Sequence, residues 1–158
     1  MIAFDRGPAR FNYRIVGIAL HNNQVLLHKA VHERFWALPG GRAEMLESAT
    51  ETLRREMREE LGLAVQVERL VWIVEDFYWD AARKTHELAL YFLMSLPPDC
   101  ALYTSPGPFK GQEEHNPLIF QWFPCADLEQ ITLYPTFLQR ALKSLPAGIE
   151  HIVIDETS

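Results

Sequence analysis

The chain has 158 residues, 48% of them hydrophobic, which fits one globular domain with a sizeable core. Its 15 Lys and Arg residues and 21 Asp and Glu residues give a net charge of −6, and there is no basic run. This argues against electrostatic binding to long nucleic acid or to an anionic membrane surface. No stretch approaches the roughly 20 apolar residues of a membrane span, and the first residues lack the apolar core of a signal peptide. We therefore expect one cytoplasmic domain over residues 1–158, with no membrane partner.

The first predicted elements are two strands, Arg14 to Leu20 and Gln24 to Ala30, because both segments are rich in β-branched and apolar residues. The short polar segment His21-Asn22-Asn23 between them is typical of a turn, so we expect a hairpin. Pro39-Gly40-Gly41 follows, and a proline next to two glycines predicts a sharp turn in a loop rather than a continued strand.

A helix of about four turns is predicted between Ala49 and Leu61. Ser48 can cap its N-terminus, and Gly62 is the residue type expected just past its C-terminus. An apolar stripe at i, i+4 and i+8 should face the core; it consists of Leu53, Met57 and Leu61, with Ala49 one turn earlier.

Beyond this helix, residues 65–75 and 86–96 are rich in β-branched and aromatic residues and predict a second antiparallel pair of strands, separated by a polar stretch around residues 80–85. Residues 97–117 are dense in Pro, Gly and charge, and a loop of this length within a domain is often functional. The remaining predicted elements are a strand at 118–123, a short helix starting at 126–129, a helix with apolar spacing over 134–145 and an edge strand at 149–154. Strands interleaved with two substantial helices predict a mixed sheet covered on both faces.

Three carboxylates of the predicted helix, Glu56, Glu59 and Glu60, stand at i, i+3 and i+4, a spacing that brings them together on one side of the helix. They repel one another unless a cation compensates, and carboxylate oxygens favour a hard ion, Mg²⁺ first and Mn²⁺ second. Taken alone, the pattern also fits a solvated face of the helix. Helical geometry places Glu60 at the edge of the apolar stripe, Glu56 just beyond it and Glu59 further round.

The surrounding positions complete a longer pattern. It reads Gly41, five residues, Glu47, seven residues, Arg55-Glu56, an apolar residue, any residue, Glu59-Glu60, any residue, Gly62 and an apolar residue. In this pattern the segment Gly41 to Leu63 resembles the complete signature of the Nudix hydrolase family. The resemblance implies an α/β/α sandwich with a mixed β-sheet, in which the signature forms a loop, helix and loop that bind metal. It also implies Mg²⁺-dependent hydrolysis of a nucleoside diphosphate linked to another group, with water attacking phosphorus.

The resemblance also assigns roles to residues. Glu56, Glu59 and Glu60 are the implied metal ligands, with the Gly41 carbonyl as a plausible further ligand. Arg55 is expected to pair with a neighbouring glutamate and orient it, although an ordinary surface ion pair is the alternative. Glu47 is expected near the site.

The general base is less defined. Family members often use a glutamate in a loop ahead of the late strand, and Glu113 and Glu114 lie in the corresponding region. Either residue is a candidate, against the alternative that both are solvated loop charges. In some relatives a signature glutamate is the base, which keeps Glu56 and Glu59 as candidates.

Substrate recognition is predicted from aromatic residues. Phe77, Tyr78 and Trp79 precede a loop and could stack a nucleobase, or could pack at the rim of the core. Arg34 is a further candidate for binding substrate. His86-Glu87 opens an apolar strand; the pair either lines the cleft from the sheet side or is a strand-end pair exposed to water.

The sequence does not select among substrates. The extra motifs associated with coenzyme A and NADH pyrophosphatases are missing. We predict a small-molecule partner, a nucleotide, nucleotide sugar or dinucleotide, and a homodimer is compatible with the sequence. Two alternative functions remain. One is a catalytically silent Nudix-like nucleotide-binding or regulatory domain, whose usual mark is the loss of signature glutamates, and the other is a diphosphate isomerase. No signature glutamate is lost here.

Overall fold

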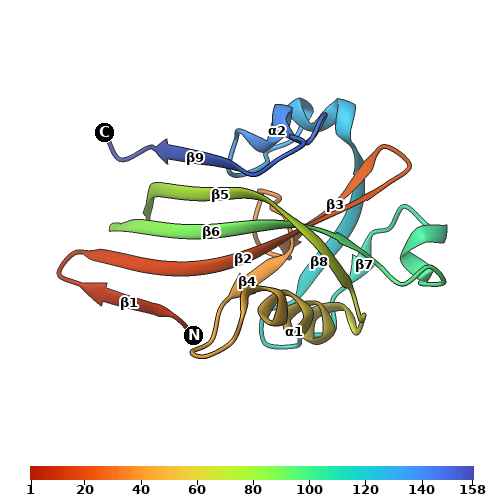
Figure 1. The fold of residues 1–158 in the computed structure, drawn as a ribbon, viewed down its shortest axis with the longest axis horizontal. Coiled ribbons are helices and arrows are strands. Elements are labelled where there is room, and N and C mark those ends of the chain that lie inside the picture. The colour runs from red at the N-terminus through yellow and green to blue at the C-terminus, as the bar shows by residue number, and fades with distance from the viewer.

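The computed structural model describes residues 1–158 and contains a nine-stranded mixed sheet (Figure 1). The strand order is β7-β8-β3-β2-β6-β5-β9, and β1 and β4 pair with β2. The β2–β6 and β5–β9 pairs are parallel and the others are antiparallel. The strands are β1 (Ala3–Arg6), β2 (Ala9–His21), β3 (Gln24–Ala30), β4 (Gly40–Arg42), β5 (Gln66–Asp80), β6 (Arg83–Ser95), β7 (Phe109–Lys110), β8 (Leu118–Pro124) and β9 (Glu150–Asp155).

The predicted first hairpin is present as β2 and β3. Asn22 and Asn23 have φ values of 51° and 61°, a left-handed conformation that asparagine tolerates and that two-residue hairpin turns require. The two strands pair only at Leu20–Val25 and His21–Gln24 and then diverge. After the divergence, β2 pairs with β4 and β1 on that edge. The other edge of β3 pairs with β8 along its whole length.

The second predicted pair is also antiparallel, but its strands are longer than the sequence suggested. β5 and β6 pair from Gln66–Ser95 to Asp80–Arg83, so only Ala81 and Ala82 lie between them. Most of the expected polar connection at 80–85 is therefore strand. The predicted C-terminal edge strand is β9, which pairs in parallel with β5.

The turn predicted at Pro39-Gly40-Gly41 is present only as a bend at Pro39, and the two glycines do not belong to a loop. Gly40 and Gly41 are extended residues of β4, and Gly41 pairs with Ile15. A Cβ atom on Gly40 would collide with the Ile15 carbonyl oxygen, and one on Gly41 would collide with the Glu56 carboxyl group. Glycine is needed here for close approach rather than for a turn.

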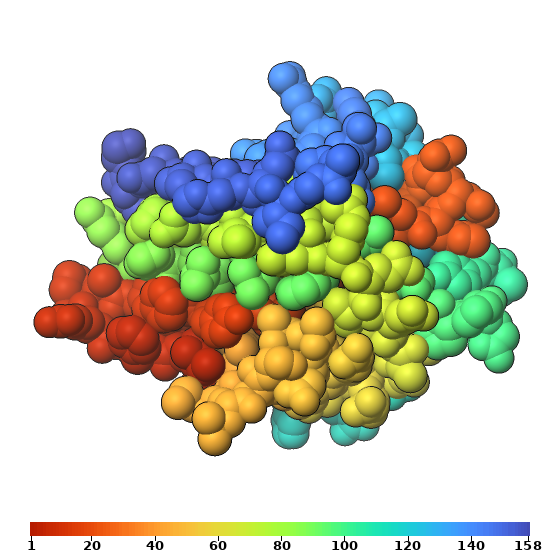
Figure 2. All heavy atoms as spheres, in the orientation of Figure 1, coloured from red at the N-terminus to blue at the C-terminus, as the bar shows by residue number.

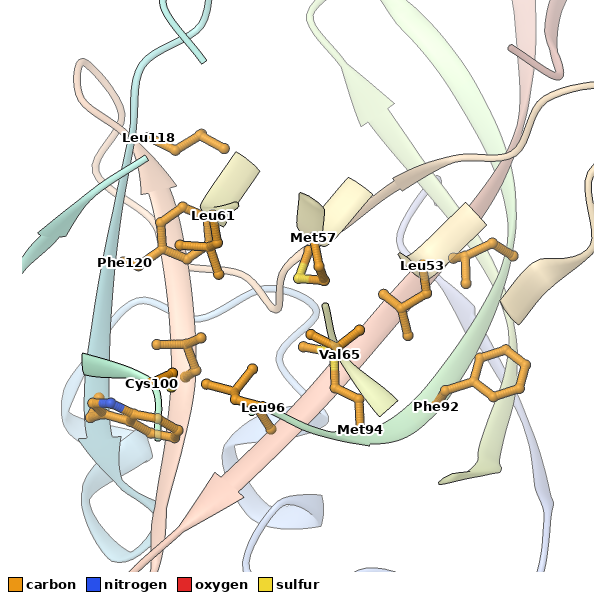
Figure 3. Packing of buried hydrophobic residues seen from close by; sticks show 14 of the residues in the cluster. Leu53, Met57, Leu61, Val65, Phe92, Met94, Leu96, Cys100, Leu118 and Phe120 are labelled. Atoms are coloured by element: carbon orange, nitrogen blue, oxygen red, sulfur yellow. The ribbon is translucent and has the colours of Figure 1, made fainter. Parts of the chain in front are cut away.

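Helix α1 (Ala49–Leu61) has the predicted bounds. Ser48 and Glu51 form a reciprocal capping box at its start, and Gly62 ends it with φ 69°. The apolar stripe of the helix packs against one face of the sheet, as Figure 3 shows for Leu53, Met57 and Leu61. Phe92 and Met94 of β6 lie on the opposite side of this core. We call this side of the sheet the α1 face.

The other side of the sheet, which we call the α2 face, carries a second core that includes Trp72, Val74 and Tyr91. Above it lie the 3-10 helix η2 (Cys125–Gln130) and α2 (Leu138–Ala141) (Figure 1). The expected helix over 134–145 is thus shortened to four residues. Most backbone bonds on both sides of α2 run from i to i+3, as in Leu138 to Pro135, so the segment forms successive tight turns that still bury Leu138 and Leu142.

The predicted mixed sheet with a layer on each face is confirmed, although the α2-face layer is made of short helices and turns. The expected loop at 97–117 contains the 3-10 helix η1 (Ala101–Thr104) and β7. In the space-filling view, the segment around α1 occupies the lower middle of the front face and β9 its upper left (Figure 2). None of the helices is both long and apolar enough to cross a membrane.

Candidate metal and substrate site

Arg55 is the centre of the ion network on α1. Its Nε donates to Glu47 Oε2 at 2.8 Å, and its Nη1 donates to Glu56 Oε1 at 2.8 Å and to Glu59 Oε2 at 3.3 Å. Its Nη2 donates to the Arg42 carbonyl oxygen at 3.1 Å, which ties the helix to β4. The ion pair expected for Arg55 is therefore present, with three glutamates rather than one.

Glu47 lies in the connection ahead of α1 and is held from two sides. Both of its carboxylate oxygens accept from Arg55, and the Thr52 hydroxyl donates to Oε1 at 2.6 Å. The hydrogen bonds from Arg55, the largest cause, lower the pKa of Glu47 from 4.5 to about 2. Glu47 is thus a fixed anion that orients Arg55.

Glu56, Glu59 and Glu60 differ in exposure in the predicted order. Glu60 is 6% exposed, Glu56 is half-buried and Glu59 is exposed. Burial, the largest cause, and the neighbouring Glu56 charge raise the pKa of Glu60 to about 8, and burial also raises the pKa of Glu56. The structure thus brings Glu56 and Glu60 together at the inner side of the helix, while Glu59 lies further out, where it accepts from Arg55 and its charge acts on Glu56.

The donor set fits a hard divalent cation. Glu60 Oε2 is buried without a hydrogen-bond partner, and so is His28 Nδ1, which faces it at 3.9 Å. Burial lowers the pKa of His28 to about 3, so His28 is neutral and does not compensate the Glu60 charge. The side chains do not converge in a preformed group of three ligands. Two neighbouring carboxyl groups with an unpartnered oxygen nevertheless supply the oxygen donors that Mg²⁺ or Mn²⁺ binds, and their raised pKa values indicate that a nearby cation is needed to keep both ionised.

The loop before β8 docks on the C-terminal end of α1. The Gln112 backbone N–H donates to the Glu60 carbonyl oxygen at 2.7 Å, and the Gln112 side chain covers Gly62. Glu113 is close enough for its charge to raise the pKa of Glu60 further. The structure therefore brings Glu113 to the carboxylate cluster, whereas no contact joins the exposed Glu114 to it.

Arg14 is a residue of this site that the sequence reading missed. Its side chain belongs to none of the ion pairs that Lys and Arg form with carboxylates. Burial raises the pKa values of Glu56 and Glu60 at one end and of Tyr78 at the other, and the positive charge of Arg14 acts on all three groups in the opposite direction. A half-buried arginine without a carboxylate partner, between acidic groups, can bind an anion. The one feature of the sequence that pointed to Arg14 is that it is a single charged residue at the start of an apolar strand.

The structure separates the predicted aromatic cluster. Tyr78 points to the α2 face, while Phe77 stacks on His86, with ring centroids 4.4 Å apart, on the α1 face. Trp79 is half exposed, and Lys84 Nζ lies 5.2 Å from its ring centroid. The three rings therefore share no stacking surface. Arg34 is exposed and makes no ion pair with a carboxylate.

The α2 face holds three further polar residues that the sequence reading did not place together. Thr85 and Glu87 of β6 alternate with residues of the α1 face and point the same way as Tyr91. Asp76 of β5 pairs directly with Glu87. His86 and Glu87 are thus interior residues of β6 that point to opposite faces, and only Glu87 lies on the polar side.

Comparisons with known proteins agree with this architecture. A model of the NUDIX domain matches residues 12–145. The 8-oxo-dGTP diphosphatase of Buchnera aphidicola subsp. Schizaphis graminum is 29% identical over 84 residues, 51% of this chain and 59% of that protein. A Bacillus subtilis protein provisionally named ADP-ribose pyrophosphatase is 34% identical over 59 residues, 37% of this chain and 28% of that protein. The matches thus span less than two thirds of either relative.

A crystal structure of an ADP-ribose pyrophosphatase from Streptococcus suis superposes with a TM-score of 0.62 at 21% identity. The superposition covers 90% of this chain and 98% of the other, and it shows the shared fold. The domain match covers most of the chain and includes the whole segment Gly41 to Leu63. The chain belongs to the NUDIX family.

Proposed function

We propose that this member of the NUDIX family is a metal-dependent pyrophosphohydrolase that cleaves the diphosphate bond of a small nucleoside diphosphate derivative. The observation that carries the proposal is the carboxylate cluster of α1, in which the buried Glu60 has an oxygen without a partner beside Glu56. Keeping such charges together has a cost in stability, which a bound cation offsets.

Glu56, Glu59 and Glu60, with the Gly41 carbonyl, are the residues that would hold Mg²⁺, or Mn²⁺ in its place. When bound, the ion would polarise phosphoryl oxygens and lower the pKa of a water molecule. The missing side chain at Gly41 supports this assignment, because it lets the Glu56 carboxyl group approach the backbone of β4.

The residues around the cluster would position it. Glu47 holds Arg55 through both carboxylate oxygens, and Arg55 in turn holds Glu56 and Glu59. Such supporting contacts fix the direction of a metal ligand and affect affinity or activity by about 10- to 100-fold when removed. We therefore assign Arg55 and Glu47 as positioning residues.

Arg14 would bind the diphosphate. Its guanidinium is free of carboxylate partners and its charge acts on both Glu56 and Glu60, so an anion bound at the cluster lies within its field. A planar guanidinium can donate two parallel hydrogen bonds to a phosphate. Because the net charge of the chain is −6, such a local cation matters for attracting a polyanion.

Glu113 is our first candidate for the general base, because its loop docks on the end of α1 and its charge acts on Glu60. An exposed carboxylate can accept a proton from water held near the cluster. Glu114 remains a second candidate on the same loop, and Glu56 and Glu59 remain candidates within the signature.

The test is a screen of nucleoside triphosphates, dinucleotides and nucleotide sugars with Mg²⁺ or Mn²⁺, followed by product identification. Performing the reaction in ¹⁸O-labelled water shows which phosphorus is attacked, because one product gains the label. We expect hydrolysis of at least one diphosphate derivative that stops when EDTA removes the metal. Absence of metal-dependent hydrolysis across the panel would contradict the proposal.

A further inference from the structure

A row of polar side chains crosses the α2 face beyond Arg14. Asp76 of β5 stands directly opposite Glu87 of β6, and Tyr78 stands opposite Thr85. The Tyr78 hydroxyl donates to Glu87 Oε2 at 3.3 Å. We call Asp76, Tyr78, Thr85 and Glu87 the polar row.

Two atoms of the polar row are buried without a partner. In the whole chain only five buried side-chain atoms lack a hydrogen bond. Two belong to the contact between His28 and Glu60, and two others are Asp76 Oδ1 and Thr85 Oγ1. Asp76 is 9% exposed and Thr85 is 2% exposed. An unpaired buried polar group destabilises the fold, and so do like charges opposite each other on neighbouring strands, as at Asp76 and Glu87. Hydrogen bonds within the chain therefore do not account for the burial of Asp76 and Thr85.

The polar row and the carboxylate cluster lie at two ends of one path along β2. Arg14 pairs with Ala89, and Arg10, four residues earlier, pairs with Thr85. Four residues of strand span about 13 Å. Arg14 lies on the path between the two ends, since its charge acts on Glu60 and on Tyr78. Arg10, the strand partner of Thr85, also lines a surface hollow, together with Gly7, Pro8, Arg42 and residues 80–83.

The chemistry of the polar row favours hydroxyl groups over a stacked ring. Its side chains offer two carboxyl groups and two hydroxyls, which together accept and donate several hydrogen bonds. Tyr78 is the only aromatic residue among them, and its hydroxyl is engaged by Glu87. Phe77 and Trp79 point away from the row, so neither can join Tyr78 in sandwiching a base.

We propose that the polar row is a recognition subsite for a polyhydroxylated, glycosyl group attached to the diphosphate, with Asp76 and Thr85 as specificity-determining residues. The proposal rests on the proposed function, because it places the diphosphate between Arg14 and the carboxylate cluster. The preferred substrate class is then a nucleoside diphosphate sugar or an equivalent glycosyl diphosphate, rather than a nucleoside triphosphate.

The test compares binding of non-hydrolysable ligands that differ only in the glycosyl group. The α,β-methylene analogue of ADP-ribose is compared with that of ADP, and the analogue of UDP-glucose with that of UDP, by calorimetry in Mg²⁺. The proteins are the wild type, Thr85→Val, Thr85→Ser and Thr104→Val. Thr104→Val is a matched control, because Thr104 lies on η1 and its hydroxyl bonds only within its own turn.

In the wild type, at least one glycosyl analogue should bind about 10-fold or more tightly than its glycosyl-free partner, the gain expected of one or two net hydrogen bonds. Thr85→Val should reduce that preference about 3- to 10-fold, the value of one hydrogen bond. Thr85→Ser should restore it, and Thr104→Val should leave it unchanged. The melting temperature of Thr85→Val should equal or exceed that of the wild type, because the substitution removes an unpaired buried hydroxyl.

Two results would overturn the inference: no glycosyl preference in either pair, or a preference that survives Thr85→Val. A lower melting temperature together with an unchanged preference would show that Thr85 is only structural. Hydrolysis of the natural substrates is measured separately. Metal-dependent hydrolysis without a glycosyl preference refutes the subsite and leaves the proposed function standing, whereas a glycosyl preference without hydrolysis refutes the proposed function.

Discussion

The carboxylates of α1 and those of the polar row are built in opposite ways. On α1, Arg55 donates to Glu47, Glu56 and Glu59 and ties them to β4, so the chain itself fixes most of the charges. In the polar row, Asp76 stands beside Glu87 without any cation paired to it. The difference supports our proposals that the carboxylates of α1 form the reaction centre and that the polar row gains its missing partners from a ligand.

The largest expected effect comes from Glu56→Gln. This change removes a charge that touches Arg55 and neighbours Glu60, and we expect kcat to fall by about 100-fold or more, since a lost metal ligand removes several kcal/mol of transition-state stabilisation. Steady-state kinetics and circular dichroism measure the effect and the integrity of the fold. Glu68→Gln is the control, because Glu68 is exposed on β5 and bonds only to Ser95. Similar kcat values for both variants would place the reaction centre elsewhere.

Arg14→Ala should have a smaller effect, and mainly on substrate binding. Losing a charge-assisted bond to phosphate should raise KM about 10- to 100-fold, because such bonds contribute roughly 1.5–3 kcal/mol. Arg14→Lys should recover only part of the loss, since a lysine cannot donate two parallel bonds. Steady-state kinetics measure kcat and KM separately, and the change should fall mainly on KM. An unchanged KM in Arg14→Ala would show that Arg14 does not bind the diphosphate between the two regions.

The smallest effect is one of stability, at Asp76. Burial, the largest cause, with the charges of Glu87 and Glu156, raises the pKa of Asp76 from 3.8 to about 7. The stability that its protonated form contributes is complete below pH 3.8 and is lost as the pH rises to about 7. Asp76→Asn should therefore match the wild type near pH 4 and be more stable at pH 8 by about 1–3 kcal/mol.

Urea unfolding at pH 4 and pH 8 measures this difference, with the exposed Asp80→Asn as control. An Asp76→Asn variant that is less stable than the wild type at pH 8 would mean that the Asp76 carboxylate has a partner in the fold.

The carboxylates of α1 could largely be predicted from the sequence, whereas the polar row could not. The bounds of α1, its caps and the order of exposure of its glutamates follow from local spacing, so Ser48, Gly62 and Glu60 were placed correctly. The polar row depends on the register of the β5–β6 hairpin, which the sequence did not predict, because residues 80–85 were expected to form a polar connection rather than strand.

Two local predictions failed for related reasons. The glycines of β4 were read as a turn, whereas a close approach to Ile15 and Glu56 requires them. The apolar spacing over 134–145 was read as a long helix, although tight turns bury the same leucines. In both cases one residue pattern is compatible with two local structures, and tertiary packing determines which of them forms.

Binding of Mg²⁺ to the folded protein tests the central claim most directly. In thermal unfolding with and without millimolar Mg²⁺, the wild type should gain about 2–8 °C, as expected for roughly 1–2 kcal/mol of ligand stabilisation in a chain of this size. Glu56→Gln and Glu60→Gln should lose most of that gain, while Glu68→Gln should keep it. An equal gain in all four proteins, or no gain in the wild type, would contradict a metal site at the carboxylates of α1.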